Sequence, residues 1–148
     1  MNKMPIPQIA IKRLDKSLPL PEYQTTGSVG FDIASSQDVE IQPQEIALIP
    51  TNLVIKVPEG YMLMLVSRSS TPRKKGLLKP HSIGIIDQDY CGDTDELKIQ
   101  VYNFTSQPVQ ISVGDRIAQG IFVPVLKAQF VEVDSHNSTA RGGFGSTG

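Results

Sequence analysis

The chain has 148 residues, no tryptophan, one cysteine, two histidines and only 6% aromatic residues. A single cysteine, Cys91, cannot form an internal disulfide, which favours a reducing, cytoplasmic setting. Two histidines and one cysteine are too few for a zinc site built on Cys and His ligands. The net charge of -1 argues against a general nucleic-acid-binding surface.

Long hydrophobic runs are also missing. No apolar segment approaches the roughly 20 residues that a membrane-spanning helix requires. The first residues, MNKMPIPQIAIKRLDK, lack the sustained apolar stretch of a secretory signal. With 39% hydrophobic residues, the chain has enough apolar side chains for one domain with a real core. We therefore expect a single globular domain with no membrane partner.

What is abundant is strand-like sequence. Short apolar or alternating segments are separated by turn residues such as Pro58-Glu59-Gly60 and Gly114-Asp115. This spacing is typical of an antiparallel barrel or sandwich. The expected strands lie within residues 7–14, 39–41, 45–57, 61–66, 97–103, 109–113 and 117–126.

One short helix is expected after the segment SRSSTPRKKG. Ser69 or Ser70 can cap the helix, Pro72 suits its first turn, and Gly76 can end it. Arg68 and the two hydroxyls would then lie at a helix start that favours a bound anion. The alternative is an ordinary capped helix with a solvated basic face.

Residues 134–148 read DSHNSTARGGFGSTG and are rich in glycine. We expect a flexible arm that closes an active site, following a β-barrel domain over residues 1–133. The glycine spacing fits G-x-G-x-x-G, but no strand–turn–helix context surrounds it, so a dinucleotide-binding loop is rejected. Phe144 could stack on a base while backbone N–H groups bind phosphate. The alternative is a disordered tail.

The segment GIIDQDY is the most informative in the chain. The apolar residues Ile85 and Ile86 should deliver the carboxylate of Asp87 to the tip of a β-hairpin, and Tyr90 follows closely. Such an acid could hold a water molecule against one side of a substrate while the ring contacts the other. Calcium binding by this loop is excluded, since Cys91 and Lys98 stand where an EF-hand needs ligands.

The segment GDRIAQ predicts a tight turn that enters a strand. Asp115 and Arg116 can pair locally, and either Ala118 or Gln119 should face away from the core. A serine triad is not supported, because His81 and His136 have no visible reason to meet a serine.

Together and in order, GSVGFDIASS, SRSSTPRKKG, GIIDQDY, GDRIAQ and RGGFGSTG resemble the five motifs of the trimeric dUTPase family. The resemblance runs from about Gly27 to Gly148. It implies a jelly-roll-like β-barrel that forms a homotrimer and hydrolyses dUTP to dUMP and pyrophosphate with Mg²⁺. It also implies that each active site is shared by three subunits.

The resemblance implies a role for each matching residue. Asp87 would activate the attacking water, and Tyr90 would pack under the deoxyribose and leave no room for a 2′-hydroxyl. No residue would bind the metal directly, although Asp32 and Gln119 could contact its water ligands. The other implied substrate contacts are Arg68, Ser69, Ser70, His81, Gly84, Ile86, Gln119, Arg141, Phe144, Gly145, Ser146 and Thr147.

The sequence also departs from the family pattern. Ser70 replaces the usual glycine, His81 a common asparagine, and Cys91 an arginine or glutamine. The segment around residues 91–96 is about three residues longer than usual. Arg141 lies three residues before Phe144 instead of five.

Two alternative functions remain open from the sequence. The related dCTP deaminases share an R-S-S sequence, but they use a glutamate as acid and base where this chain has Gln100. A β-rich regulatory protein that binds a nucleotide without hydrolysing it is the second alternative.

Overall fold

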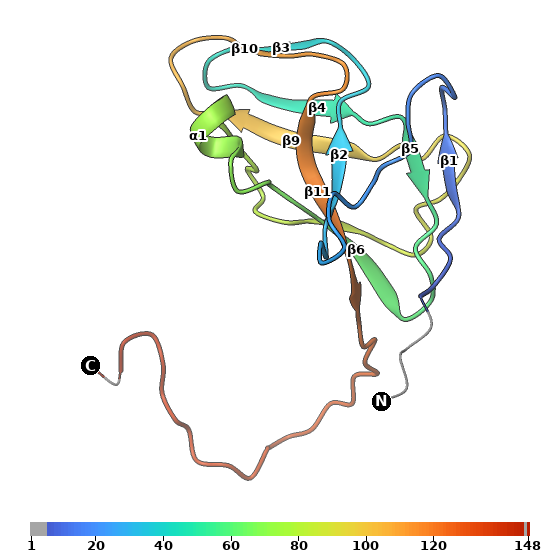
Figure 1. The fold of residues 1–148 in the computed structure, drawn as a ribbon. Coiled ribbons are helices and arrows are strands. Elements are labelled where there is room, and N and C mark those ends of the chain that lie inside the picture. Colours follow the sequence, from blue (N-terminus) through green and yellow to red (C-terminus); the bar gives the residue numbers. More distant parts are fainter. Residues whose placement is uncertain (1–5, 147) are drawn as a thin grey trace.

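The computed structural model describes residues 6–146 and 148. These residues form an almost all-β domain with one short helix (Figure 1). No helix among them is long and apolar enough to cross a membrane. The elements are β1 (Ile11–Arg13), β2 (Phe31–Ala34), β3 (Val39–Ile41), β4 (Ile46–Pro50), β5 (Leu53–Ile55), β6 (Tyr61–Val66), α1 (Thr71–Lys75), β7 (Leu77–Leu78), β8 (Gly84–Ile86), β9 (Lys98–Asn103), β10 (Val109–Ile111) and β11 (Arg116–Pro124).

All of the described strand pairs are antiparallel, and they form four small sheets. The largest has the order β2-β11-β6-β8, and a second has the order β4-β9-β7. The pairs β1-β5 and β10-β3 complete the set. This arrangement confirms the expected jelly-roll-like class, although the described strands form separate sheets and not one closed ring.

One hydrophobic core lies between the sheets. Buried side chains of β6, such as Leu63 and Leu65, belong to the same cluster as Ile49 of β4 and Ile99 of β9. The strand expected within residues 97–103 is confirmed as β9, and its side chains alternate, because Ile99 and Val101 are buried while Lys98 is exposed. Burial of this continuous apolar set is the main force that holds the sheets together.

The helix is confirmed in position and length. Ser70 occupies the N-cap position, and Gly76 ends the helix with a φ of 67°, a conformation that glycine adopts without strain. The Ser70 side chain makes no capping hydrogen bond. Its hydroxyl is therefore available to a ligand.

Some strands are shorter than the sequence predicted. Segment 7–14 yields only β1, and segment 45–57 is divided into β4 and β5 by Thr51 and Asn52. Asn52 has a φ of 71°, which breaks the extended conformation. Asparagine tolerates this left-handed region better than most residues, so the turn replaces a continuous strand.

The prediction that Asp87 lies at a hairpin tip was wrong. β8 pairs with β6, and the next strand along the chain, β9, belongs to the other large sheet. Asp87 therefore follows the end of a strand at the edge of its sheet, where the chain crosses to the second sheet. It remains exposed there.

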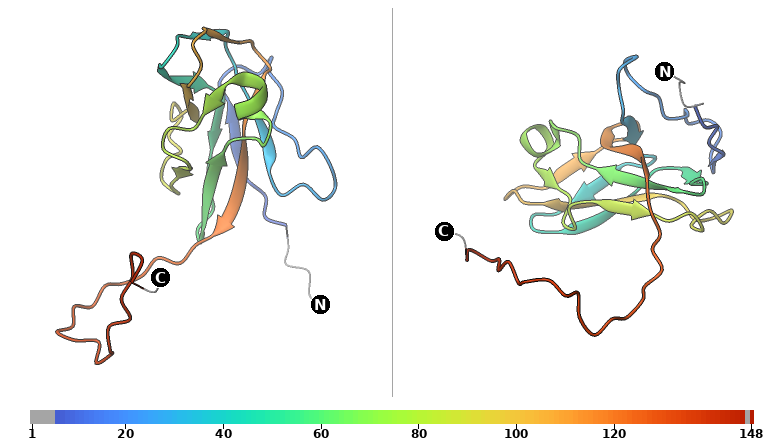
Figure 2. Two further views of the ribbon diagram at one scale, coloured as in Figure 1. Left: turned by 90° about the vertical axis from the view of Figure 1, so that its left-hand side faces the viewer. Right: turned by 90° about the horizontal axis from the view of Figure 1, so that it is seen from below.

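After β11 the chain leaves the domain. The two further views in Figure 2 show residues 126–146 as an extended segment away from the sheets. These residues are all exposed. Their apolar side chains, among them Leu126 and Phe130, contribute nothing to the domain core.

Candidate active site

Asp32 lies between two arginine side chains. Its Oδ1 lies 2.8 Å from Nε of Arg68, and its Oδ2 lies 3.1 Å from Nη1 of Arg116. The Asp32 side chain is only 14% exposed. One partly buried carboxylate thus fixes two guanidinium groups, which remain suited to bind phosphate.

The strand register explains why these groups meet. Asp32 of β2 lies opposite Gln119 of β11, and Arg116 lies opposite Ala34 two residues along β2. A register shift between Arg116 and Ala118 marks a bulge in β11. Arg68 follows the end of β6, which pairs with the other side of β11.

The pairing expected within GDRIAQ was wrong. Asp115 does not pair with Arg116; its Oδ2 lies 3.3 Å from Nζ of Lys75 in α1. Hydrogen bonding from the N–H of Ser112, assisted by Lys75, holds the pKa of Asp115 below its usual value. Arg116 instead reaches Asp32 and was missed as a site residue, because only the sheet register brings the two segments together.

Gln119 faces the same cluster, as its alternation with the buried Ala118 predicted. Its Nε2 donates a hydrogen bond to the carbonyl oxygen of Ser67 at 3.2 Å. A Cβ atom at Gly30 would overlap Oε1 of Gln119. Glycine at position 30 therefore makes room for this amide, a requirement that sequence reasoning missed although GSVG was singled out.

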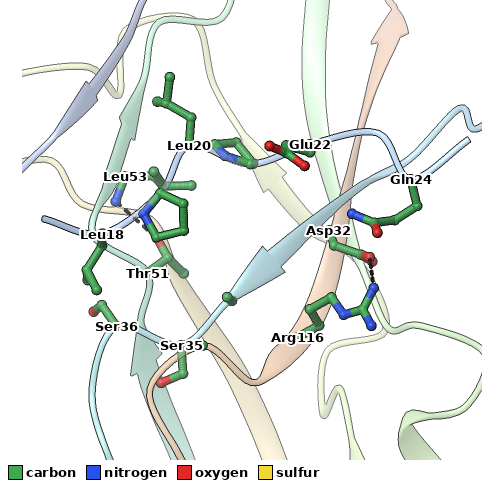
Figure 3. A pocket seen from close by; sticks show the side chains of 14 residues that line it. Leu18, Leu20, Glu22, Gln24, Asp32, Ser35, Ser36, Thr51, Leu53 and Arg116 are labelled. Atoms are coloured by element: carbon green, nitrogen blue, oxygen red, sulfur yellow. Dashed lines mark hydrogen bonds and ion pairs between the residues drawn. The ribbon is translucent and has the colours of Figure 1, made fainter. Parts of the chain in front are cut away.

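A cavity of about 260 Å³ borders the ion pair between Asp32 and Arg116. Figure 3 shows both side chains at its edge, together with residues of the loop before β2. Glu22 and Gln24 of that loop also line the cavity. Arg68, Ser69 and Ser70 lie outside its lining, so the cavity adjoins the arginine cluster without containing it.

Asp87 and Tyr90 form a separate group at the end of β8. Gln88, between them, donates a hydrogen bond from Nε2 to the carbonyl oxygen of Tyr61 at 3.1 Å. The Tyr90 hydroxyl donates to the carbonyl oxygen of Glu96 at 3.0 Å. The turn that carries the acid and the ring is therefore attached to the start of β6 and to the start of β9.

The two groups lie at opposite ends of β6. Ile86 pairs with Leu63 near the start of β6, whereas Arg68 follows its last residue, Val66. Strand residues advance about 3.3 Å each, so Asp87 and Arg68 are separated by roughly 15–20 Å. One copy of the chain does not bring the acid to the arginines.

His81 and Gly84 lie nearer the arginine end. Gly84 pairs with Leu65, and a Cβ atom at position 84 would press on Cβ of Leu65 and touch Nε2 of His81. Burial and the nearby charge of Lys79 lower the pKa of His81, and burial also lowers the pKa of Lys79. The lowered pKa favours the uncharged imidazole of His81, in which one ring nitrogen can accept a hydrogen bond.

The predicted arm residues lie far from both groups. Phe144 is completely exposed. Arg141, Gly145 and Ser146 belong to the same extended segment, in which Ser146 donates a backbone hydrogen bond to Gly143 at 3.0 Å. Thr147 lies outside the described residues.

The residues offer little for direct metal ligation. Among those that the structure describes, no three His, Cys, Asp or Glu side chains gather as a metal-binding group. Asp32 and Gln119 supply one carboxylate and one amide oxygen beside two arginines. This donor set fits a cation that keeps its water ligands and binds substrate phosphates, as Mg²⁺ does.

The comparisons with known proteins define a class of β-rich nucleotidohydrolases. The sequence model of the dUTPase family matches residues 16–148. The deoxyuridine 5'-triphosphate nucleotidohydrolase of Lactococcus lactis is 39% identical over 144 residues, which cover 95% of each chain. That of Desulfitobacterium hafniense is 41% identical over 153 residues, covering 100% of this chain and 99% of the relative. The chain belongs to the dUTPase family.

Solved structures agree with this assignment. The crystal structure of dUTPase from Streptococcus mutans is 34% identical, with a TM-score of 0.76 over 81% of this chain and 98% of that chain. The dUTPase of Staphylococcus bacteriophage 80alpha with dUPNHPP is 29% identical, with a TM-score of 0.84 over 95% of this chain and 98% of that chain.

Replacing Asp32 should destabilise the domain. Asp32→Asn leaves Arg68 and Arg116 close together without their shared counter-charge, so we expect a loss of about 1–3 kcal/mol in the free energy of unfolding. Urea denaturation measures this loss. The control is Asp93→Asn, which removes an exposed ion pair with Lys12 and should cost less than about 1 kcal/mol. Equal stabilities of the two variants would contradict the role given to Asp32.

Proposed function

We propose that the chain hydrolyses dUTP to dUMP and pyrophosphate by water attack at the α-phosphorus. Its membership of the dUTPase family supports the reaction. The observation that carries the assignment of residues is the presence of an arginine cluster at one end of β6 and an exposed acid with an aromatic ring at the other. These are the two kinds of group that hydrolysis of a nucleoside triphosphate requires.

The arginine cluster would bind the triphosphate. Arg68 is held by Asp32 through Nε, so its terminal nitrogen atoms are free to meet phosphate oxygens. Ser69 is exposed and Ser70 has no capping bond, so both hydroxyls can donate to phosphate. Negative charge moves toward the departing pyrophosphate during the reaction, and fixed donors stabilise that charge.

Asp87 would act as the general base. Its exposed carboxylate can orient one water molecule and accept its proton as the water oxygen bonds to the α-phosphorus. The bond from the α-phosphorus to the bridging oxygen breaks, and pyrophosphate leaves with the bonding electrons. A placed base contributes about 10²–10⁴-fold to such a rate.

The uracil and the deoxyribose of the substrate would be recognised near β8. Backbone groups from His81 through Gly84 to Ile86 would read the uracil edge, and the Tyr90 ring would face the deoxyribose. Phe144 would stack on the uracil when the arm closes, with Gly145, Ser146 and Thr147 contacting phosphate and Arg141 nearby. Residues 134–148 thus form the closing arm of a domain that spans residues 1–133.

Mg²⁺ would neutralise the triphosphate oxygens when bound with the substrate. Asp32 and Gln119 would hold its water ligands through their oxygen atoms. The Asp32 oxygens retain lone pairs for this purpose although they form two ion pairs. Gln119 forms its hydrogen bond through Nε2, so its Oε1 can accept from a water ligand.

The active site would be completed in a homotrimer. The separation of Asp87 from Arg68 along β6 requires a second copy to supply the missing group. The exposed apolar residues Ile46 and Leu48 on the outer face of β4 suit a subunit interface. Exposed Phe130 and Val131 in the extended segment suit the surface of a neighbouring subunit.

The deaminase and regulatory alternatives are not preferred. Gln100 is a half-buried amide on β9, and an amide neither gains nor loses a proton readily enough to act as a general acid and base. We place the hydrolase in the cytoplasm, in keeping with its single cysteine.

Asp87→Asn should retain dUTP binding and lose about 10²–10⁴-fold in kcat, because the amide cannot accept the proton of water. Pyrophosphate release measures turnover, and calorimetry with a non-hydrolysable dUTP analogue measures binding. Asp89→Asn, a neighbouring exposed acid in the same turn, is the matched control and should remain active. Turnover of Asp87→Asn within severalfold of the unmodified chain would exclude the proposed base.

Deletion of residues 141–148 should reduce turnover at least about tenfold, because the closed arm excludes water and strengthens charge interactions. The melting temperature should be unchanged, since residues 141–146 and 148, which the structure describes, are all exposed. A shortened chain with full activity would show that the arm does not close the site.

A further inference from the structure

The Tyr90 ring is exposed but its hydroxyl is not free. Tyr90 is 41% exposed, and its hydroxyl donates to the backbone carbonyl oxygen of Glu96 at 3.0 Å. The acceptor belongs to the longer segment between β8 and β9. The orientation of the ring therefore depends on how firmly this segment is held.

Glu96 is anchored to a buried turn. Its Oε1 accepts a hydrogen bond from the backbone N–H of Asn52 at 2.8 Å. Asn52 is 4% exposed and separates β4 from β5. The side-chain amide of Asn52 forms two hydrogen bonds with the backbone of Asp15. Its Oδ1 accepts from the Asp15 N–H at 2.6 Å, and its Nδ2 donates to the Asp15 carbonyl oxygen at 2.8 Å. Glu96 thus bonds to the backbone of a turn whose Asn52 side chain is already held by Asp15.

The residue after Glu96 is held by the same turn. The N–H of Leu97 donates to the carbonyl oxygen of Leu53 at 2.8 Å, and the Thr51 hydroxyl donates to the carbonyl oxygen of Leu97 at 2.6 Å. Leu97 is fully buried. The Glu96 carbonyl group is therefore attached to a firmly held part of the domain, and it accepts the hydrogen bond from the exposed Tyr90 side chain.

We propose that Glu96 is a positioning residue that sets the sugar selectivity of the site through Tyr90. The inference rests on the proposed function, in which the Tyr90 ring faces the deoxyribose. An exposed ring without a partner for its hydroxyl rotates readily, and its movement would open space for a 2′-hydroxyl. The chain from Asn52 through Glu96 to the hydroxyl holds the ring in one orientation and keeps that space closed.

The test compares kcat/KM for dUTP and UTP. Glu96→Ala removes the anchor on Asn52, and Tyr90→Phe removes the hydroxyl, so each should lower the preference for dUTP roughly threefold to tenfold. Because both act on one chain of contacts, the double variant should lose no more than either single variant. Glu96→Gln keeps an oxygen acceptor for Asn52 and should retain the preference.

Asp93→Ala is the matched control in the same segment. It removes only the exposed ion pair with Lys12, so selectivity should stay at the value of the unmodified chain. General destabilisation changes the melting temperature without changing the ratio for the two nucleotides. If Glu96→Ala does not fold, Glu96→Asp, whose side chain is one methylene shorter, should show the same loss of selectivity.

A second measurement does not depend on catalysis. In protein labelled with 3-fluorotyrosine, the ¹⁹F signal of Tyr90, assigned by its absence in Tyr90→Phe, should shift in Glu96→Ala and stay in place in Glu96→Gln and Asp93→Ala. Unchanged selectivity and an unchanged signal in Glu96→Ala, or additive losses in the double variant, would overturn the inference. An unmodified chain that does not hydrolyse dUTP would overturn the proposed function instead, while the ¹⁹F signal would still report on the contact.

Discussion

The length of β6 is the constraint on which the proposed site depends. This strand connects the turn beside Asp87 to the segment that carries Arg68, and its extended backbone keeps the two apart. An extended strand cannot shorten, so no side-chain movement closes a gap of this size within one copy. In the proposed function, the acid and the arginines of one site therefore come from different copies of the chain.

Within each copy, polar contacts to buried backbone or partly buried acids position the exposed groups. Asp32 holds Arg68 and Arg116, and Gly30 leaves room for Gln119. The turn at Asn52 holds Glu96, and Glu96 holds the hydroxyl of Tyr90. The side chains of Arg68, Arg116 and Tyr90 thus each have a fixed neighbour, which reduces the entropy lost when substrate binds.

Structural features that depend only on neighbouring residues in the sequence could be predicted from local sequence patterns. The alternation along β9, the end of α1 at Gly76 and the outward direction of Gln119 follow from residue periodicity and backbone preference. The pairing of Arg116 with Asp32 and the edge position of β8 did not follow, because they depend on the register between distant strands. The five motifs supplied the candidate site residues, and the resemblance implied a shared site, but the spacing of the motifs does not show that one copy separates Asp87 from Arg68.

Mixing two inactive variants tests the shared site most directly. Arg68→Ala and Asp87→Asn are unfolded together at equal concentration and refolded, so that mixed assemblies form. A site that takes Arg68 from one copy and Asp87 from another regains both residues in about a quarter of random combinations, and the account predicts about a quarter of the original dUTP hydrolysis. A mixture as inactive as its two components would show that each site is built from a single copy.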